Sequence, residues 1–97
     1  MTSRTKNTPC PVTIVADLLS DTWTMRIIHT VLGSDYTRFC ELERSLVGIS
    51  TRTLTLKLKT LEHRRIIEKT DAGYSATRLG VKLRPVLKAM EQFGKQL

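Results

Sequence analysis

The sequence predicts a mainly α-helical domain that carries one small β-hairpin, an α+β arrangement. Apolar residues recur at three- and four-residue intervals along most of the chain, which is the period of amphipathic helices. Two short β-favouring runs, "IIE" and "YSAT", flank the turn-forming residues "DAG". The length of 97 residues and the hydrophobic content of 40% suit a single globular domain. We expect this domain over residues 10–97, after a flexible polar arm over residues 1–9.

The N-terminal part predicts two helices. The first is expected over residues 12–20, and Pro11 suits its first turn. Ser20 or Asp21 is a good cap for the second helix, and Gly33 is a typical helix end. The apolar positions of the second helix are Trp23, Ile27, Ile28, Val31 and Leu32.

A helix-turn-helix is predicted in the middle of the chain. Phe39, Leu42 and Leu46 mark the buried stripe of a short third helix. Gly48 permits a tight turn and Ser50 is a good N-cap for a fourth helix over residues 51–64. Two helices joined by such a short turn are typical of this DNA-binding motif.

The β-hairpin and a last helix complete the predicted order. Ile66–Glu68 and "YSAT" favour two strands, and Gly73 between them can adopt a positive φ. Thr77 is a good cap for a final helix, which Pro85 should kink or interrupt. A helix-turn-helix followed directly by a hairpin is the order of a winged helix-turn-helix domain.

The fourth helix predicts a buried and an exposed face. Leu54, Leu58 and Leu61 follow at three- and four-residue spacing and form the buried stripe. Arg52, Leu56 and Lys59 lie on the opposite side, a basic and acid-free surface. Such a surface suits DNA, although a solvated amphipathic helix has the same pattern.

Each polar group of this helix has a candidate role on DNA. Hydroxyls at a helix start suit phosphate oxygens, and these candidates are Ser50, Thr51, Thr53 and Thr55. Arg52 suits a guanine edge, whereas Lys57 and Lys59 suit phosphates. Leu56 is either a contact to a thymine methyl group or an ordinary exposed leucine.

Further basic residues follow the fourth helix. Lys69 and Arg78 border the hairpin and are candidates for contacts to the DNA backbone or minor groove. Arg64 and Arg65 either approach DNA or only stabilise the helix C-terminus through its dipole.

The net charge of +7 lies entirely in the second half of the chain. Residues 1–48 carry five basic and five acidic groups, whereas residues 49–97 carry eleven basic and four acidic groups. A one-sided basic excess indicates a polyanionic partner, such as double-stranded DNA. A basic face that only aids solubility is the alternative.

Other classes of protein and site find little support. No nucleophile–base set, glycine-rich phosphate loop or metal-ligand spacing is present, so we expect neither an enzyme nor a cofactor. No run of about 18 apolar residues exists, so we expect no membrane span. The start of the chain lacks the apolar stretch of a secretion signal, and we therefore expect a cytoplasmic protein.

The order of elements and four stretches together resemble the HxlR-type transcriptional regulators, a winged helix-turn-helix family related to the MarR group. The matching stretches are "CPV" at 10–12, "WTMRII" at 23–28, "RFCELERSLVGISTRTLTLKLKTLE" at 38–62 and "YSATRLG" at 74–80. They are spread over nearly the whole chain. The sequence departs from the family at Arg65, where a glycine is common, and in its short wing.

The resemblance implies a homodimeric DNA-binding regulator. The N-terminal segment and the last helix would form the dimer interface, and the helix from Thr51 to about Arg64 would enter the major groove. Cys10 matches a cysteine that senses quinones, aldehydes or oxidants in several members, which implies a small-molecule or oxidant effector. Its position at a helix start near cations favours a reactive thiolate, whereas a buried hydrophobe at the dimer interface is the alternative reading. A winged-helix module for protein interaction or non-specific architectural DNA binding remains the rival function.

Overall fold

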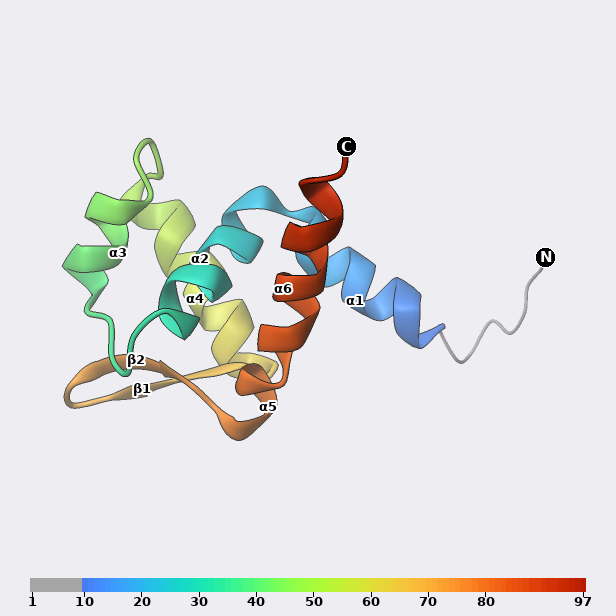
Figure 1. Cartoon of the computed structure of the whole chain (residues 1–97). Coiled ribbons are helices and arrows are strands. Elements are labelled where there is room, and N and C mark those ends of the chain that lie inside the picture. Colours follow the sequence, from blue (N-terminus) through green and yellow to red (C-terminus); the bar gives the residue numbers. More distant parts are fainter. Residues whose placement is uncertain (1–9) are drawn as a thin grey trace.

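A computed structural model of the chain describes residues 10–97 (Figure 1). The predicted flexible arm over residues 1–9 lies outside the described residues. The elements are α1 (Pro11–Ser20), α2 (Thr22–Leu32), α3 (Phe39–Ser45), α4 (Thr51–His63), β1 (Ile67–Thr70), β2 (Gly73–Ala76), α5 (Arg78–Val81) and α6 (Leu83–Gly94). The predicted mainly helical fold with one hairpin, and its winged helix-turn-helix order, are confirmed.

The core lies between α2, α3, α4 and the hairpin. Its largest fully buried side chains include Ile27 and Ile28 of α2 and Leu42 of α3. The predicted inward stripe of α4 is buried, with Leu54, Leu58 and Leu61 exposed by no more than 1%. Helices α1 and α6 contribute no fully buried residue and lie on the side of the molecule opposite α3 (Figure 1).

The hairpin is antiparallel and pairs Ile67 with Ala76 and Thr70 with Gly73. The segment before α3 adds an isolated bridge to it. Thr37 and Tyr74 exchange two backbone hydrogen bonds of 2.8 Å each. This bridge fixes the hairpin against the start of the helix-turn-helix.

The final helix is interrupted, but three residues before Pro85. Thr77 caps the short α5, and α6 begins after Lys82. Pro85 therefore falls in the first turn of α6, where backbone N–H groups have no intrahelical partner and a proline is tolerated. The predicted interruption is thus confirmed, and its position follows from this proline preference.

Helix α4 ends in a left-handed residue even though the position is not a glycine. Arg65 has a φ of 63°. Its N–H donates to the Glu62 carbonyl at 2.9 Å, and the N–H of Ile66 donates to the Leu61 carbonyl at 3.0 Å. This is the Schellman pattern of a helix C-terminus. Position 65 therefore keeps a positive φ, although it holds an arginine where a glycine is common in the family.

Candidate nucleic-acid interface

The fourth helix, α4, is held with one face toward solvent. Its three core leucines anchor the inner side, and the Ser50 hydroxyl caps the start by accepting the N–H of Thr53 at 3.0 Å. On the outer side Arg52, Leu56 and Lys59 succeed one another at helical spacing and are all exposed. Leu56, between these two cations, is 54% exposed. The expected division of α4 into two faces is confirmed by this burial.

The two outward cations are free of carboxylates. Among residues 10–97 the single ion pair joins Lys57 to Asp21. Arg52 and Lys59 therefore keep their charges available to an external anion. No acidic residue precedes Glu62 in this helix.

The hydroxyls near the start of α4 are partly occupied inside the protein. Thr51 donates to the Glu43 carboxylate of α3 at 2.6 Å, and Thr55 donates to the Thr51 carbonyl at 2.8 Å. Ser50 donates to the Thr53 hydroxyl at 2.9 Å, which leaves the Thr53 proton free. Of these bonds, the one between Thr51 and Glu43 joins α4 to α3, and the other two lie within α4 and its cap. In this arrangement Thr53 is the candidate hydroxyl that retains a donor.

Lys57 lies at the side of α4 and reaches Asp21 at the N-cap of α2. The two side chains are 33% and 31% exposed. The Lys57 ammonium is the main cause that holds the pKa of Asp21 below its ordinary value. Asp21 also accepts the N–H of Trp23 at 3.0 Å and the Thr24 hydroxyl at 3.1 Å. Lys57 thus links α4 to the start of α2, and it is also a cation near the outer face of α4.

The two hairpin candidates lie apart from each other. Lys69 is exposed on β1, and its Nζ sits 5.9 Å from the centre of the Tyr74 ring. Arg78 is the first residue of α5, beyond the opposite end of β2 from the hairpin turn (Figure 1). The structure therefore puts Lys69 near the wing tip and Arg78 at the wing base.

Cys10 lies at the N-terminus of α1, far along the chain from α4. Its thiol is exposed, as is that of Cys40. The backbone N–H groups of Thr13 and then Val12 lower the pKa of the Cys10 thiol, which favours the thiolate. Burial of this thiol at the dimer interface stays the alternative prediction, because the exposure is that of a single chain.

The sequence did not reveal which residues outside α4 hold this helix in place. The sequence indicates Glu43 only as a charge, and Asp21 and Thr77 only as helix caps. The Thr77 hydroxyl caps α5 by accepting the Gly80 N–H at 3.0 Å, and it also reaches the carbonyls of Arg65 at 2.5 Å and Ile66 at 3.1 Å as a donor. Such long-range partners leave no periodic signal in a single sequence.

Comparison with known families decides the affiliation of the chain. The family model described as "HxlR-like helix-turn-helix" matches residues 18–97. The chain is a member of the HxlR-like helix-turn-helix family. Among its relatives, the HTH-type transcriptional regulator sll1512 of Synechocystis is 35% identical over 92 residues, covering 88% of this chain and 67% of that protein. YybR of Bacillus subtilis, also an HTH-type transcriptional regulator, is 31% identical over 94 residues, covering 89% and 74%.

Solved structures agree with this HxlR assignment. Quinone-bound YodB of B. subtilis superposes with a TM-score of 0.83 at 30% identity, covering 92% of this chain and all of that one. A MarR-family regulator of Porphyromonas gingivalis superposes with a TM-score of 0.78 at 28% identity, covering 96% of this chain and 97% of that one. The protein is therefore a helix-turn-helix transcriptional regulator with a winged-helix fold related to MarR.

Proposed function

We propose that this regulator binds a specific double-stranded DNA sequence as a homodimer, with α4 in the major groove. The observation that carries the proposal is the outward face of α4. It presents Arg52, Leu56 and Lys59 to solvent without any carboxylate partner among the described residues. A guanidinium can donate two hydrogen bonds to guanine, and an ammonium can neutralise a phosphate. The Thr53 hydroxyl, whose proton is free, would donate a hydrogen bond to a DNA phosphate at the start of α4.

The homodimer is supported by the apolar surfaces of α1 and α6. Neither helix has a fully buried residue, yet both carry large apolar side chains. Val12 is 74% exposed and Phe93 is 66% exposed. A protein surface of this kind is typical of an association site. Two copies joined there would present two α4 helices to half-sites about one DNA turn apart.

The wing plays a smaller part in the proposal. Lys69 near its tip and Arg78 at its base are exposed and suit backbone phosphates on either side of α4. The turn between the strands carries Asp71 and no basic residue. We therefore assign the discrimination between sequences to Arg52 and Leu56, and only general affinity to the wing.

A selection of bound duplexes from a random library tests this function. We expect an enriched motif with two related half-sites, and an affinity for it that falls steeply with salt. Equal affinity for all duplexes would instead favour the architectural module. No duplex binding at all would favour a protein-interaction module.

We further propose that Cys10 makes the regulator responsive to oxidants or electrophiles. Its exposed thiol at the start of α1, with a lowered pKa, supports this role. YodB, described in a quinone-bound form, gives a precedent within the same fold. Helix α1 belongs to the proposed dimer interface. A modification at its first turn would therefore change the relative position of the two α4 helices in the dimer. The regulator needs no catalytic site for this.

A further inference from the structure

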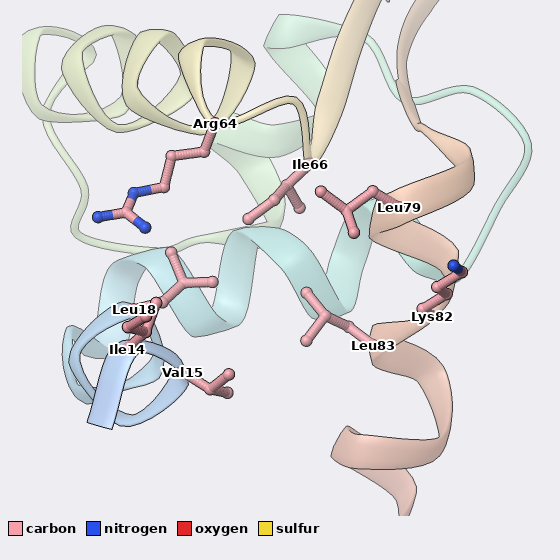
Figure 2. A pocket seen from close by; sticks show the side chains of 8 residues that line it. All are labelled: Ile14, Val15, Leu18, Arg64, Ile66, Leu79, Lys82 and Leu83. Carbon is pink, nitrogen blue, oxygen red and sulfur yellow. The ribbon is translucent and has the colours of Figure 1, made fainter. Parts of the chain in front are cut away.

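The cations of α4 differ in what they face. In the part of the chain that the structure describes, the single ion pair joins the Lys57 ammonium to the Asp21 carboxylate. Arg52 and Lys59 are exposed on the outer face. Arg64, the C-cap residue, lines a hollow of about 290 Å³ together with apolar side chains of α1 (Figure 2). Lys57 is therefore the cation of this helix that meets an anion inside the protein.

The Asp21 carboxylate is fixed by its own helix. It accepts the backbone N–H of Trp23 at 3.0 Å through Oδ1, and the Thr24 hydroxyl at 3.1 Å through Oδ2. Oδ2 is also the oxygen that meets Lys57. The lysine is the mobile partner, because its ammonium ends a flexible four-carbon stem. The place of the ion pair is therefore set by Asp21.

Lys57 lies where the proposed DNA complex needs a cation. It follows Thr53 by four residues, so the two side chains are neighbours on one flank of α4. Thr53 is the hydroxyl that we expect to donate to a DNA phosphate. A phosphate bound there would lie beside the Lys57 side chain, and Asp21 would compete with it for the same ammonium.

We infer that Asp21 is a positioning residue that holds the Lys57 ammonium away from DNA phosphates and so lowers the affinity for duplexes of any sequence. The inference rests on the proposed DNA-binding function. Its effect is uniform across sequences, because phosphate contacts carry no sequence information. Binding to unrelated DNA is essentially electrostatic, so withholding one cation lowers that binding directly.

The competing explanation is that the ion pair only orients α4. Its loss would then misalign Arg52 with a base edge and weaken the selected duplex more than other duplexes, since base contacts depend on alignment. The side chains of Lys57 and Asp21 are 33% and 31% exposed. Ion pairs that water reaches so readily are weak. This exposure favours exchange of the ammonium between Asp21 and a phosphate.

Fluorescence anisotropy with Asp21→Asn tests this role, using the selected duplex and a scrambled duplex at several salt concentrations. Asparagine keeps a side-chain oxygen that can cap α2. We expect both duplexes to bind about threefold more tightly at low salt, as the loss of a weak competing ion pair allows. The salt slope should become steeper by about 0.9, the value for one additional phosphate contact.

Asp17→Asn is the matched control for the change in charge. Asp17 is exposed on α1, four residues before Asp21, and takes no part in the ion pair with Lys57. This variant removes the same negative charge, and we expect it to leave the salt slope at the parent value. An equally steep slope in Asp17→Asn would show that net charge alone causes the gain, and would overturn the inference.

A double-mutant cycle assigns the gain to Lys57. Asp21→Asn in the Lys57→Gln background should leave the slope unchanged, because no ammonium is released there. A slope that still becomes steeper without the lysine would show that Asp21 acts through its own charge on the DNA. That result would also overturn the inference.

Thermal unfolding of each variant verifies that the compared proteins are folded. If folded Asp21→Asn bound both duplexes no more tightly than the parent, or lost affinity mainly for the selected duplex, the role of Asp21 would be overturned and the orienting pair favoured. In that case the parent still binds DNA and the proposed function stands. A parent that binds no duplex would contradict the proposed function itself, and the role of Asp21 with it.

Discussion

The ammonium of Lys57 in the recognition helix forms an ion pair with the carboxylate of Asp21 at the N-cap of α2. Asp21 thus performs two tasks, since it also caps α2 by accepting the N–H of Trp23. The pair links the start of the second helix to the middle of α4. It makes the orientation of the recognition helix depend on a residue 36 positions earlier in the chain.

Asp21→Asn should remove a contribution to the free energy of unfolding that is present at neutral pH and lost in acid. The pKa of Asp21 is lowered in the folded state, chiefly by Lys57. Its contribution is therefore present above the unfolded carboxyl pKa of about 3.9 and is lost as the pH falls through the folded value. Asparagine keeps the N-cap acceptor. We expect the variant to be less stable than the parent at pH 7 and to approach it below about pH 4.

Denaturant unfolding across pH measures this difference. Asp71→Asn, in the exposed hairpin turn, is the matched control and should follow the parent. A constant gap between parent and Asp21→Asn from neutral to acidic pH would show that the ion pair adds no stability.

Arg65→Gly should stabilise the protein. Arg65 has a φ of 63°, and a side chain in this left-handed region costs about 1 kcal/mol relative to glycine. Because both Schellman hydrogen bonds are made by the backbone, they are kept. We expect a rise in the unfolding free energy of about 1 kcal/mol, measured by denaturant titration. Arg64→Gly, at a residue with φ of −81°, should destabilise instead.

Gly80→Ala should be strongly destabilising. A Cβ at this position would lie 2.0 Å from the backbone carbonyl oxygen of Ile66. The clash forces α5 away from the start of the hairpin, and we expect a loss of about 2–3 kcal/mol. Gly94→Ala at the end of α6 is the control, since its Cβ would meet nothing within 4 Å. A loss of stability that is equal in both variants would contradict the close approach at Gly80.

Substitutions on α4 should separate the discrimination between DNA sequences from the general affinity that positive charge provides. Arg52→Ala should weaken binding of the preferred duplex by about 1–3 kcal/mol and reduce discrimination against other sequences. Lys59→Gln should weaken all duplexes alike and lower the salt slope by about one. Lys57→Gln should change this slope less, because its ammonium is already paired with Asp21. Fluorescence anisotropy at several salt concentrations provides the measurement, and identical slopes in all three variants would contradict the assignment.

Cys10→Ser should abolish any response of DNA binding to a quinone. The thiol is exposed and its pKa is lowered, so alkylation at neutral pH should favour it over other groups. Cys40→Ser is the matched control, because Cys40 is also exposed and lies on α3. DNA binding before and after benzoquinone treatment measures the effect. An unchanged response in Cys10→Ser, or its loss in Cys40→Ser, would reject Cys10 as the sensor.

The sequence by itself determined the order of elements and the two faces of α4. Leu54, Leu58 and Leu61 recur at the helical period, and this local pattern needs no knowledge of the partners that cover them. Gly73 likewise marked the hairpin turn, because few residues other than glycine adopt its φ of 132°. The family motifs followed from the same printed letters.

Only the tertiary structure decided which polar groups remain available. Thr51 and Lys57 carry the chemistry of DNA contacts, yet the fold pairs them with Glu43 and Asp21. Arg64, for which the sequence left open a DNA contact or a helix end, lines a hollow with residues of α1 and α5. Helical and strand periods report burial along one element, whereas an ion pair or a pocket depends on the distance between elements. That distance is set by how the side chains pack together.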